Sequence, residues 1–126
     1  MQSVNMGEIH LKRQHSGTLV AITSVACDVC KDVYPFLVRF HAKHKDVQMI
    51  VMMIGEREPV LETIQQFGMT MPIVQITGMD FRKFQTGYIP FVYYVNQDGR
   101  VRAKSVVSYE EQLYLLLNNG QEKKAS

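Results

Sequence analysis

The sequence predicts an α/β fold, in which helices cover both faces of a layered sheet. Apolar runs of strand length alternate with amphipathic stretches of helical length, in the order β-α-β and then β-β-α. Val47–Ile54 is almost continuously apolar, which is typical of a central parallel strand covered on both faces. With 126 residues and 46% hydrophobic residues, the chain fits one domain, so we take residues 1–126 as a single unit.

The first half of the chain supplies the β-α-β part of this pattern. Weak alternation over Glu8–Arg13 predicts a short edge strand. Thr18–Val25 reads as a strand, and the amphipathic stretch Cys27–His44 reads as a helix. Pro35 lies inside that helix and should kink it, because the proline ring removes one backbone hydrogen bond and clashes with the preceding turn.

The next segment predicts a second helix and three strands. The helix should begin near Pro59, since proline suits a first turn, and should stop at Gly68. Ile73–Ile76 is a short strand, and Phe91–Val95 with Val101–Val107 forms an antiparallel pair. These elements complete the sheet.

Local signals mark the hairpin turn and the last helix. Asn96-Gln97-Asp98-Gly99 separates the two strands, with Gly99 supplying a positive φ angle. Ser108 followed three residues later by Glu111 predicts a capping box, and the helix after it should end at Gly120.

Composition narrows the class of protein. A net charge of +2, from 14 basic and 12 acidic residues scattered along the chain, gives no signal for binding nucleic acid or a membrane surface. No stretch reaches the ~18 apolar residues of a membrane span, and the polar N-terminus does not read as a signal peptide. We therefore expect no nucleic-acid partner. We also expect a monomer.

Cys27 and Cys30 are the only cysteines, and they stand where the predicted strand turns into the first helix. The helix offers unpaired N–H groups and its positive dipole end to a thiolate at that point. Cys27 would be the exposed nucleophile. Cys30 is about one helical turn away and could resolve a mixed disulfide formed on Cys27.

A structural staple or a zinc site explains this pair less well. A disulfide closing four residues restrains the unfolded chain by only about 2 kcal/mol, against nearly 5 for a loop of about 100. His41 lies roughly 16 Å along the same helix from Cys30, and His41 with His44 has the wrong spacing for a zinc finger. We therefore expect no metal site and no cofactor, and we interpret the pair as redox-active.

From about Thr18 to Asn118 the chain resembles the thioredoxin superfamily. Three linked features carry the resemblance: Cys27-Asp28-Val29-Cys30 at the strand-to-helix turn, Pro35 five residues after the second cysteine, and Ile89-Pro90 just before the terminal hairpin. The resemblance implies a three-layer α/β/α sandwich around a central mixed sheet. It also implies a cis peptide bond at Pro90, and a backbone contact from Ile89 to an extended client peptide.

The segment Glu56–Gln85 is longer than in classical thioredoxin, and with the Asn96–Gly99 turn it is similar to the TlpA and MauD-like branch. Members of that branch are mostly bacterial, extracytoplasmic and often tethered to a membrane, and they reduce or reshuffle disulfides of client proteins. The resemblance thus implies a disulfide-containing client, an upstream thiol electron donor, an extracytoplasmic location and room for a membrane tether outside this sequence.

Several residues depart from the family pattern. Ala26 replaces the tryptophan before the first cysteine, and Asp28-Val29 replaces Gly-Pro, so the substrate-facing rim is altered. Ala21 and Val33 occupy the two positions where relatives carry an acidic residue near the dithiol. Proton transfer is then left to water or to another carboxylate.

Asp28 bears on the direction of electron flow. Its carboxylate opposes thiolate formation on Cys27, whereas the helix N-terminus favours it. A thiolate without special stabilisation makes the reduced form less favoured, so we expect a reductant. The alternative interpretation is that Asp28 caps the helix.

Two other functions remain open from the sequence. Ser24-Val25-Ala26-Cys27 faintly echoes the S/T-x-x-C motif of thiol peroxidases, although Val20 stands where that motif begins with proline. A non-catalytic binding or metal-transfer module on the same fold is the other possibility. Thioether ligands suit Cu(I), but Met49, Met52 and Met53 belong to the apolar strand and are expected to pack in the core.

Overall fold

The computed structural model describes residues 2–9, 16–82 and 88–121, and it contains a five-stranded mixed sheet in the order β5-β4-β3-β6-β7. The sheet strands are β3 (Gly17–Ser24), β4 (Val47–Ile54), β5 (Ile73–Ile76), β6 (Phe91–Val95) and β7 (Val101–Val106). The helices are α1 (Asp28–Lys43), α2 (Arg57–Phe67), α3 (Gly78–Arg82) and α4 (Glu111–Gln121). Strands β1 (Gln2–Ser3) and β2 (Gly7–Glu8) form a separate small hairpin.

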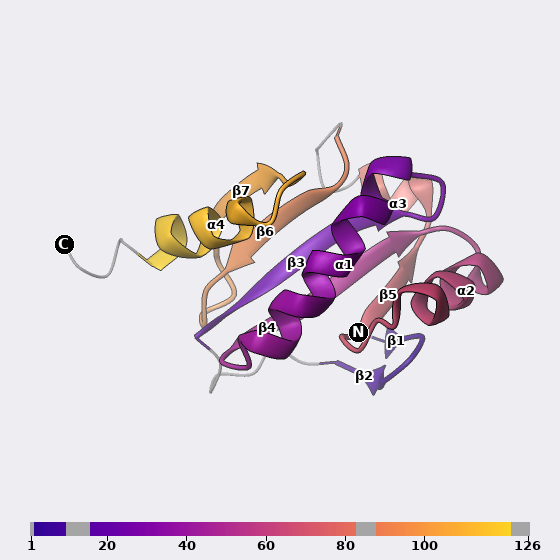
Figure 1. The fold of residues 1–126 in the computed structure, drawn as a ribbon. Coiled ribbons are helices and arrows are strands. Elements are labelled where there is room, and N and C mark those ends of the chain that lie inside the picture. Colours follow the sequence, from indigo (N-terminus) through magenta and orange to yellow (C-terminus); the bar gives the residue numbers. More distant parts are fainter. Residues whose placement is uncertain (1, 10–15, 83–87, 122–126) are drawn as a thin grey trace.

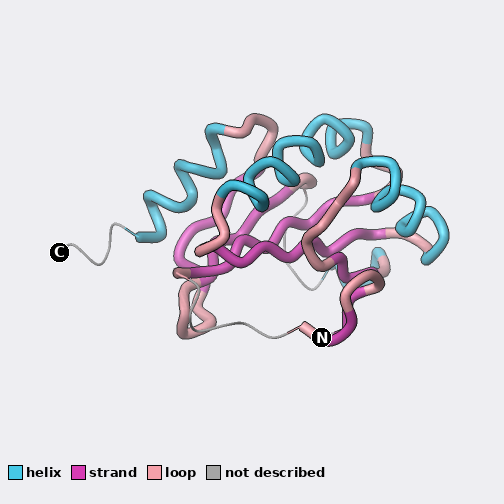
Figure 2. The backbone as a smooth tube through the Cα atoms, turned by 60° about the horizontal axis from the view of Figure 1, so that its bottom comes forward, coloured by secondary structure: helices cyan, strands magenta, loops and turns pink. Residues whose placement is uncertain are grey.

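Helices lie on both faces of the sheet, as predicted. Figures 1 and 2 show α1, α2 and α4 on one face and the short α3 on the other. Each face has its own apolar cluster. The larger one contains Leu37 of α1, Val60 of α2 and Leu113 of α4, and the smaller one is centred on Ile22 and Ile50 of the sheet. Among the described residues, the second helical layer is thin, because α3 has only five residues.

Strands β3 and β4 form the centre of the sheet. They pair in parallel from Gly17 opposite Val47 to Ser24 opposite Ile54, and β3 also pairs antiparallel with β6. The prediction of a central parallel strand at Val47–Ile54 is confirmed, because β4 lies between β3 and β5 and is parallel to both. The carboxyl ends of these strands therefore lie at one edge of the sheet.

The first two helices largely match their predictions. Helix α1 continues through Pro35, which is exposed, without a break in the helical assignment. Helix α2 begins two residues before the predicted Pro59 and ends at Gly68, whose φ of 60° is the left-handed conformation that glycine adopts without steric cost. The kink expected at Pro35 stays a prediction.

The hairpin has the expected turn. The Asn96 side-chain oxygen accepts hydrogen bonds from the backbone N–H groups of Asp98 and Arg100, both at 3.0 Å, and Gly99 has a φ of 83°. Pairing of Phe91 with Val106 places the end of β7 beside the start of β6. The predicted antiparallel pair is confirmed, and β7 forms an edge of the main sheet.

The predicted capping box before α4 is wrong. The side-chain oxygen of Gln112, rather than Glu111, accepts hydrogen bonds from the backbone N–H groups of Ser108 and Tyr109, at 2.6 and 2.8 Å. Gln112 lies one residue further along the helix than Glu111, and its side-chain oxygen lies over the first turn. The capping contact at the start of α4 thus comes from Gln112, a residue of the helix itself, rather than from the Ser108 side chain.

The predicted edge strand at Glu8–Arg13 is only partly testable, because residues 10–13 lie outside the described residues. Gly7–Glu8 is a strand, but it pairs with β1 rather than with the main sheet. The hairpin contacts the edge of β5, where the Val4 N–H donates to the Ile73 carbonyl at 2.8 Å. In the described parts of the chain, no helix has both the length and the apolar character needed to cross a bilayer.

Candidate active site

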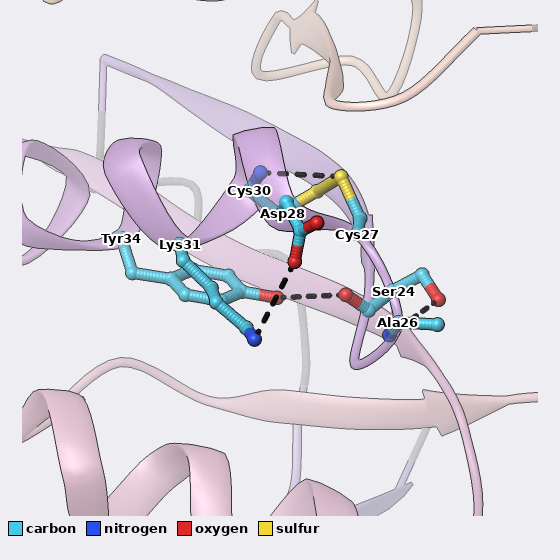
Figure 3. Close-up of a disulfide and its surroundings, with 7 residues drawn as sticks. All are labelled: Ser24, Ala26, Cys27, Asp28, Cys30, Lys31 and Tyr34. Carbon is cyan, nitrogen blue, oxygen red and sulfur yellow. Dashed lines mark hydrogen bonds and ion pairs between the residues drawn. A yellow bond between two sulfur atoms is a disulfide. The ribbon is translucent and has the colours of Figure 1, made fainter.

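Cys27 and Cys30 form a disulfide at the junction of β3 and α1. Figure 3 shows the disulfide at the amino end of the helix. Cys27 is the N-cap residue of α1, with an extended backbone, and its sulfur accepts the backbone N–H of Cys30 at 3.1 Å. Cys27 is partly exposed, whereas Cys30 is fully buried. The helix N-terminus therefore presents one accessible sulfur and hides the other.

Ser24 holds the turn that carries Cys27. Its carbonyl accepts the backbone N–H of Cys27 at 3.1 Å, and its side-chain hydroxyl accepts the backbone N–H of Ala26 at 3.2 Å (Figure 3). Both bonds tie the turn to the last residue of β3. The position of the Cys27 sulfur is thus fixed from the strand side as well as from the helix side.

The residues between the cysteines are exposed. Val29 is 50% exposed, and the Asp28 side chain is 95% exposed and forms an ion pair with Lys31 at 3.6 Å. The interpretation of Asp28 as the helix cap is wrong, because Cys27 is the N-cap and Asp28 is the first helical residue. Lys31 partly offsets the charge that Asp28 places beside Cys27. Ala26 is exposed too, so all three predicted rim residues are accessible to a partner.

The Ile89–Pro90 peptide bond is cis, as the resemblance implied. Phe91 pairs with Ile22 in the antiparallel β6–β3 ladder, so Pro90 and Ile89 continue toward the end of β3 that leads to Cys27. The Pro90 carbonyl accepts the backbone N–H of Val107 at 3.1 Å. Pro90 is buried and Ile89 is half-buried against the core. The fold thus brings the predicted client-contact segment to the same edge of the sheet as the disulfide.

Two hydroxyl-bearing residues near the disulfide were missed by the sequence analysis. Tyr34 lies one turn after Cys30 on α1, and its phenol donates to the Ser24 carbonyl at a long distance of 3.5 Å (Figure 3). Thr23 precedes Ser24 and is fully buried. The four-residue spacing of Cys30 and Tyr34, which places both on one helix face, was the available signal.

The methionines of the apolar strand pack in the core, as predicted. Met49 is 1% exposed, Met52 is 9% exposed and Met53 is fully buried. The described residues contain no group of three or more His, Cys, Asp or Glu side chains placed to hold a metal ion. Tyr94 is also in the core, at 1% exposed, whereas Tyr88 is 71% exposed next to Ile89.

Comparison with solved structures shows the same architecture over nearly the whole chain. A candidate thiol:disulfide interchange protein DsbE from Chlorobium tepidum has a TM-score of 0.81 at 15% identity, with 94% of this chain and 89% of that chain covered. StoA from Bacillus subtilis has a TM-score of 0.75 at 21% identity, with 93% of each chain covered. A secreted Mycobacterium tuberculosis disulfide oxidoreductase homologous to Escherichia coli DsbE has a TM-score of 0.69 at 11% identity, covering 82% of this chain and 79% of that chain.

No family model and no curated protein matches the sequence. The likeness is therefore one of three-dimensional structure. Three observations indicate the same fold: the strand order of the sheet, the helix that begins at the cysteine pair, and the similarity to solved structures over nearly the whole chain. The chain has the thioredoxin-like fold, with a CxxC disulfide at the amino end of its first long helix.

Proposed function

We propose that this protein is a thiol-disulfide oxidoreductase that reduces disulfides of client proteins. The observation that carries the proposal is the difference between the two sulfurs. Cys27 is accessible at the helix N-terminus, and its sulfur accepts a backbone hydrogen bond, whereas Cys30 is buried and close enough to form a disulfide with Cys27. A helix N-terminus stabilises a thiolate on the accessible sulfur. The named relatives of the same fold support this chemistry.

In the reducing direction, the Cys27 thiolate attacks one sulfur of the client disulfide. A Cys27–client bond forms, the client's own S–S bond breaks, and the departing client thiolate takes up a proton. Cys30 then loses its proton and attacks Cys27, which re-forms the internal disulfide and releases the second client thiolate. Two electrons pass from the dithiol to the client, and an upstream thiol donor must return them.

The client contact is proposed for the surface around the accessible sulfur. Ala26, Asp28 and Val29 lie exposed on one side of Cys27, and Ile89 with Pro90 lies on the neighbouring strand connection. An extended client segment would bind the Ile89 backbone in a β-like manner, which gives affinity with little side-chain specificity. We propose a monomer that acts on proteins rather than nucleic acid.

An extracytoplasmic location, in the bacterial periplasm or on the outer face of the membrane, is part of the same proposal. It is supported by the fold shared with a secreted mycobacterial disulfide oxidoreductase. Exchange of disulfides in client proteins during their maturation would take place there, because structural disulfides persist mainly outside the reducing cytosol.

The first experiment is the equilibrium reduction potential of the Cys27–Cys30 pair, together with insulin-disulfide reduction. A potential near or below about −270 mV and catalysed insulin reduction are expected. A potential near −120 mV would reverse the proposed direction and indicate an oxidase. No catalysis of exchange would contradict the proposal as a whole, and rapid hydrogen peroxide turnover in its place would favour the peroxidase alternative.

A further inference from the structure

Two buried hydroxyl groups lie close to each other between β3 and α1. Thr23 on β3 is fully buried, and Tyr34 on α1 is 1% exposed. Residues alternate between the two faces of a strand, so Thr23 is on the same face as Leu19 and Ala21, which pack in the cluster that contains α1. The hydroxyls therefore lie in the layer between β3 and α1, on the side of the sheet where Cys30 is buried.

Helix geometry directs the Tyr34 ring toward the cysteines. Side chains on a helix lean toward its N-terminus, and residues four apart lie one above the other. Figure 3 shows the ring running from α1 below the disulfide to the carbonyl of Ser24. That carbonyl also accepts the N–H of Cys27 at 3.1 Å, so the Tyr34 bond to it, at 3.5 Å, is a weak second bond to an acceptor already in use.

The Thr23 hydroxyl makes no hydrogen bond of good geometry. Its oxygen is buried and has no partner at hydrogen-bond distance and angle. The hydroxyl nevertheless lies close to the Tyr34 phenol and lowers its pKa, although burial raises that pKa by more. A buried hydroxyl without a partner is costly and calls for a physical explanation. In the oxidised state, the Thr23 and Tyr34 hydroxyls thus make only weak hydrogen bonds.

Reduction of the disulfide turns the Cys30 sulfur into a hydrogen-bond acceptor. The Cys30 sulfur, fully buried, becomes a thiol or thiolate, and a buried thiolate needs hydrogen-bond donors. In the described part of the chain, no aspartate or glutamate is buried, and the buried polar side chains other than tyrosine are Thr18, Thr23 and Gln48. Thr18 donates to Gln48 at 3.1 Å at the other end of the strands, which leaves Thr23 and Tyr34 for Cys30.

We propose that Thr23 and Tyr34 form a hydroxyl pair that donates hydrogen bonds to the Cys30 sulfur when the disulfide is reduced, and thereby stabilises its thiolate for the resolving step. This role serves the oxidoreductase function proposed above. In that step the Cys30 proton passes through water to the departing client thiolate, and both hydroxyls remain neutral donors. Burial raises the pKa of the Tyr34 phenol, which keeps it protonated and able to donate.

The direct test is the pKa of Cys30 in a Cys27→Ser background, where it is the only cysteine in the chain. NMR of ¹³C-labelled cysteine as a function of pH reports this value without requiring reagent access to the buried sulfur. Tyr34→Phe keeps the ring, and Thr23→Val keeps the shape of the side chain, so each removes mainly a hydroxyl. Each substitution should raise the Cys30 pKa by about one unit, a tenfold loss of thiolate at a given pH.

A matched control is Tyr94→Phe. Tyr94 is also 1% exposed, and its phenol donates to the Ser16 carbonyl at 3.1 Å at the opposite end of β3. This variant should leave the Cys30 pKa unchanged. Thermal unfolding of every variant checks that the fold is kept, and Thr23→Val tests the proposal by itself if Tyr34→Phe does not fold.

The redox equilibrium provides a second readout. With both cysteines present and at a pH above the Cys30 pKa, Tyr34→Phe and Thr23→Val should shift the dithiothreitol exchange equilibrium against the reduced form by up to tenfold. An unchanged Cys30 pKa in both folded variants would overturn the hydroxyl pair while leaving the oxidoreductase function intact. If wild type catalyses no exchange but the pKa shifts as expected, the hydroxyl pair stands and the proposed function falls.

Discussion

Cys27 and Cys30 are joined twice, by the disulfide and by a hydrogen bond from the Cys30 backbone N–H to the Cys27 sulfur at 3.1 Å. The second link comes from the backbone, so it does not depend on the Cys30 side chain. It also persists when the disulfide is opened, provided that the first turn of α1 keeps its geometry. The accessible sulfur of Cys27 therefore keeps this N–H donor when the disulfide is open.

Cys30→Ser should consequently trap clients. The variant keeps the N–H donor to Cys27 but lacks the thiol that resolves the mixed disulfide. Incubation with an oxidised client should give a covalent adduct at Cys27, visible by intact-mass spectrometry without reductant. Cys27→Ser should give little adduct, because its remaining thiol is buried. Equal trapping by both variants would contradict the assignment of Cys27 as the nucleophile.

Asp28→Asn should raise the reduction potential, because removal of the carboxylate favours a thiolate on Cys27 and hence the reduced form. The change should be only on the order of 10 mV, since Asp28 is exposed and paired with Lys31. Lys31→Gln should shift the potential the opposite way, and added salt should diminish both effects. If Asp28→Asn and Lys31→Gln move the reduction potential in the same direction, the charges of Asp28 and Lys31 do not control that potential.

Gly120→Ala should destabilise the protein, although alanine is the better helix former by about 1 kcal/mol. A Cβ at Gly120 would collide with the ring of Tyr94, which is buried in the core. Overpacking of this kind typically costs about 1–3 kcal/mol. Urea unfolding measures the change. Gly78→Ala is the matched control: Gly78 is also a helical residue, a Cβ there meets nothing within 4 Å, and the substitution should therefore leave the free energy of unfolding unchanged or raise it slightly.

Folding stability should decline on mild acidification through His41. Burial, and to a lesser extent the charge of Lys45, lowers the pKa of His41 below its ordinary value of 6.5. The unfolded chain then binds a proton more readily than the folded one, so the free energy of unfolding falls as pH drops through 6.5 toward the folded pKa. Urea titrations at pH 7.5 and 5.5 measure this loss.

His41→Gln should reduce the difference between the two pH values, because it removes the titrating ring. Lys45→Met should reduce it less, since it removes only the smaller cause of the shift. An undiminished difference in His41→Gln would assign the pH dependence to other groups.

Strong local patterns made most of the fold predictable. The apolar run of β4 gave its bounds without error, and Gly68 and Gly99 marked a helix end and a turn where positive φ is needed. The start of α4 was mispredicted because two adjacent polar residues could each fold back over the first turn, and only the tertiary structure selects Gln112.

The cysteine pair was predictable, but its surroundings were not. Cys27 and Cys30 stand out by type and spacing, whereas Thr23 and Tyr34 resemble ordinary strand and helix residues in the sequence. Their burial follows from the packing of α1 on β3, which no local pattern encodes. The interpretation of Asp28 failed for a related reason, since the cysteine before it had already taken the N-cap position.

The sheet places side by side two segments that the chain encodes far apart. The sulfurs belong to the contiguous unit β3-α1-β4, residues 17–54, whereas Ile89 and Pro90 arrive through the β3–β6 pairing. Under the client contact proposed for Ile89, the dithiol and the client-binding segment can therefore change independently by substitution. Substitutions around Tyr88 and Ile89 are then expected to change which clients bind, while the reduction potential of the Cys27–Cys30 pair stays the same.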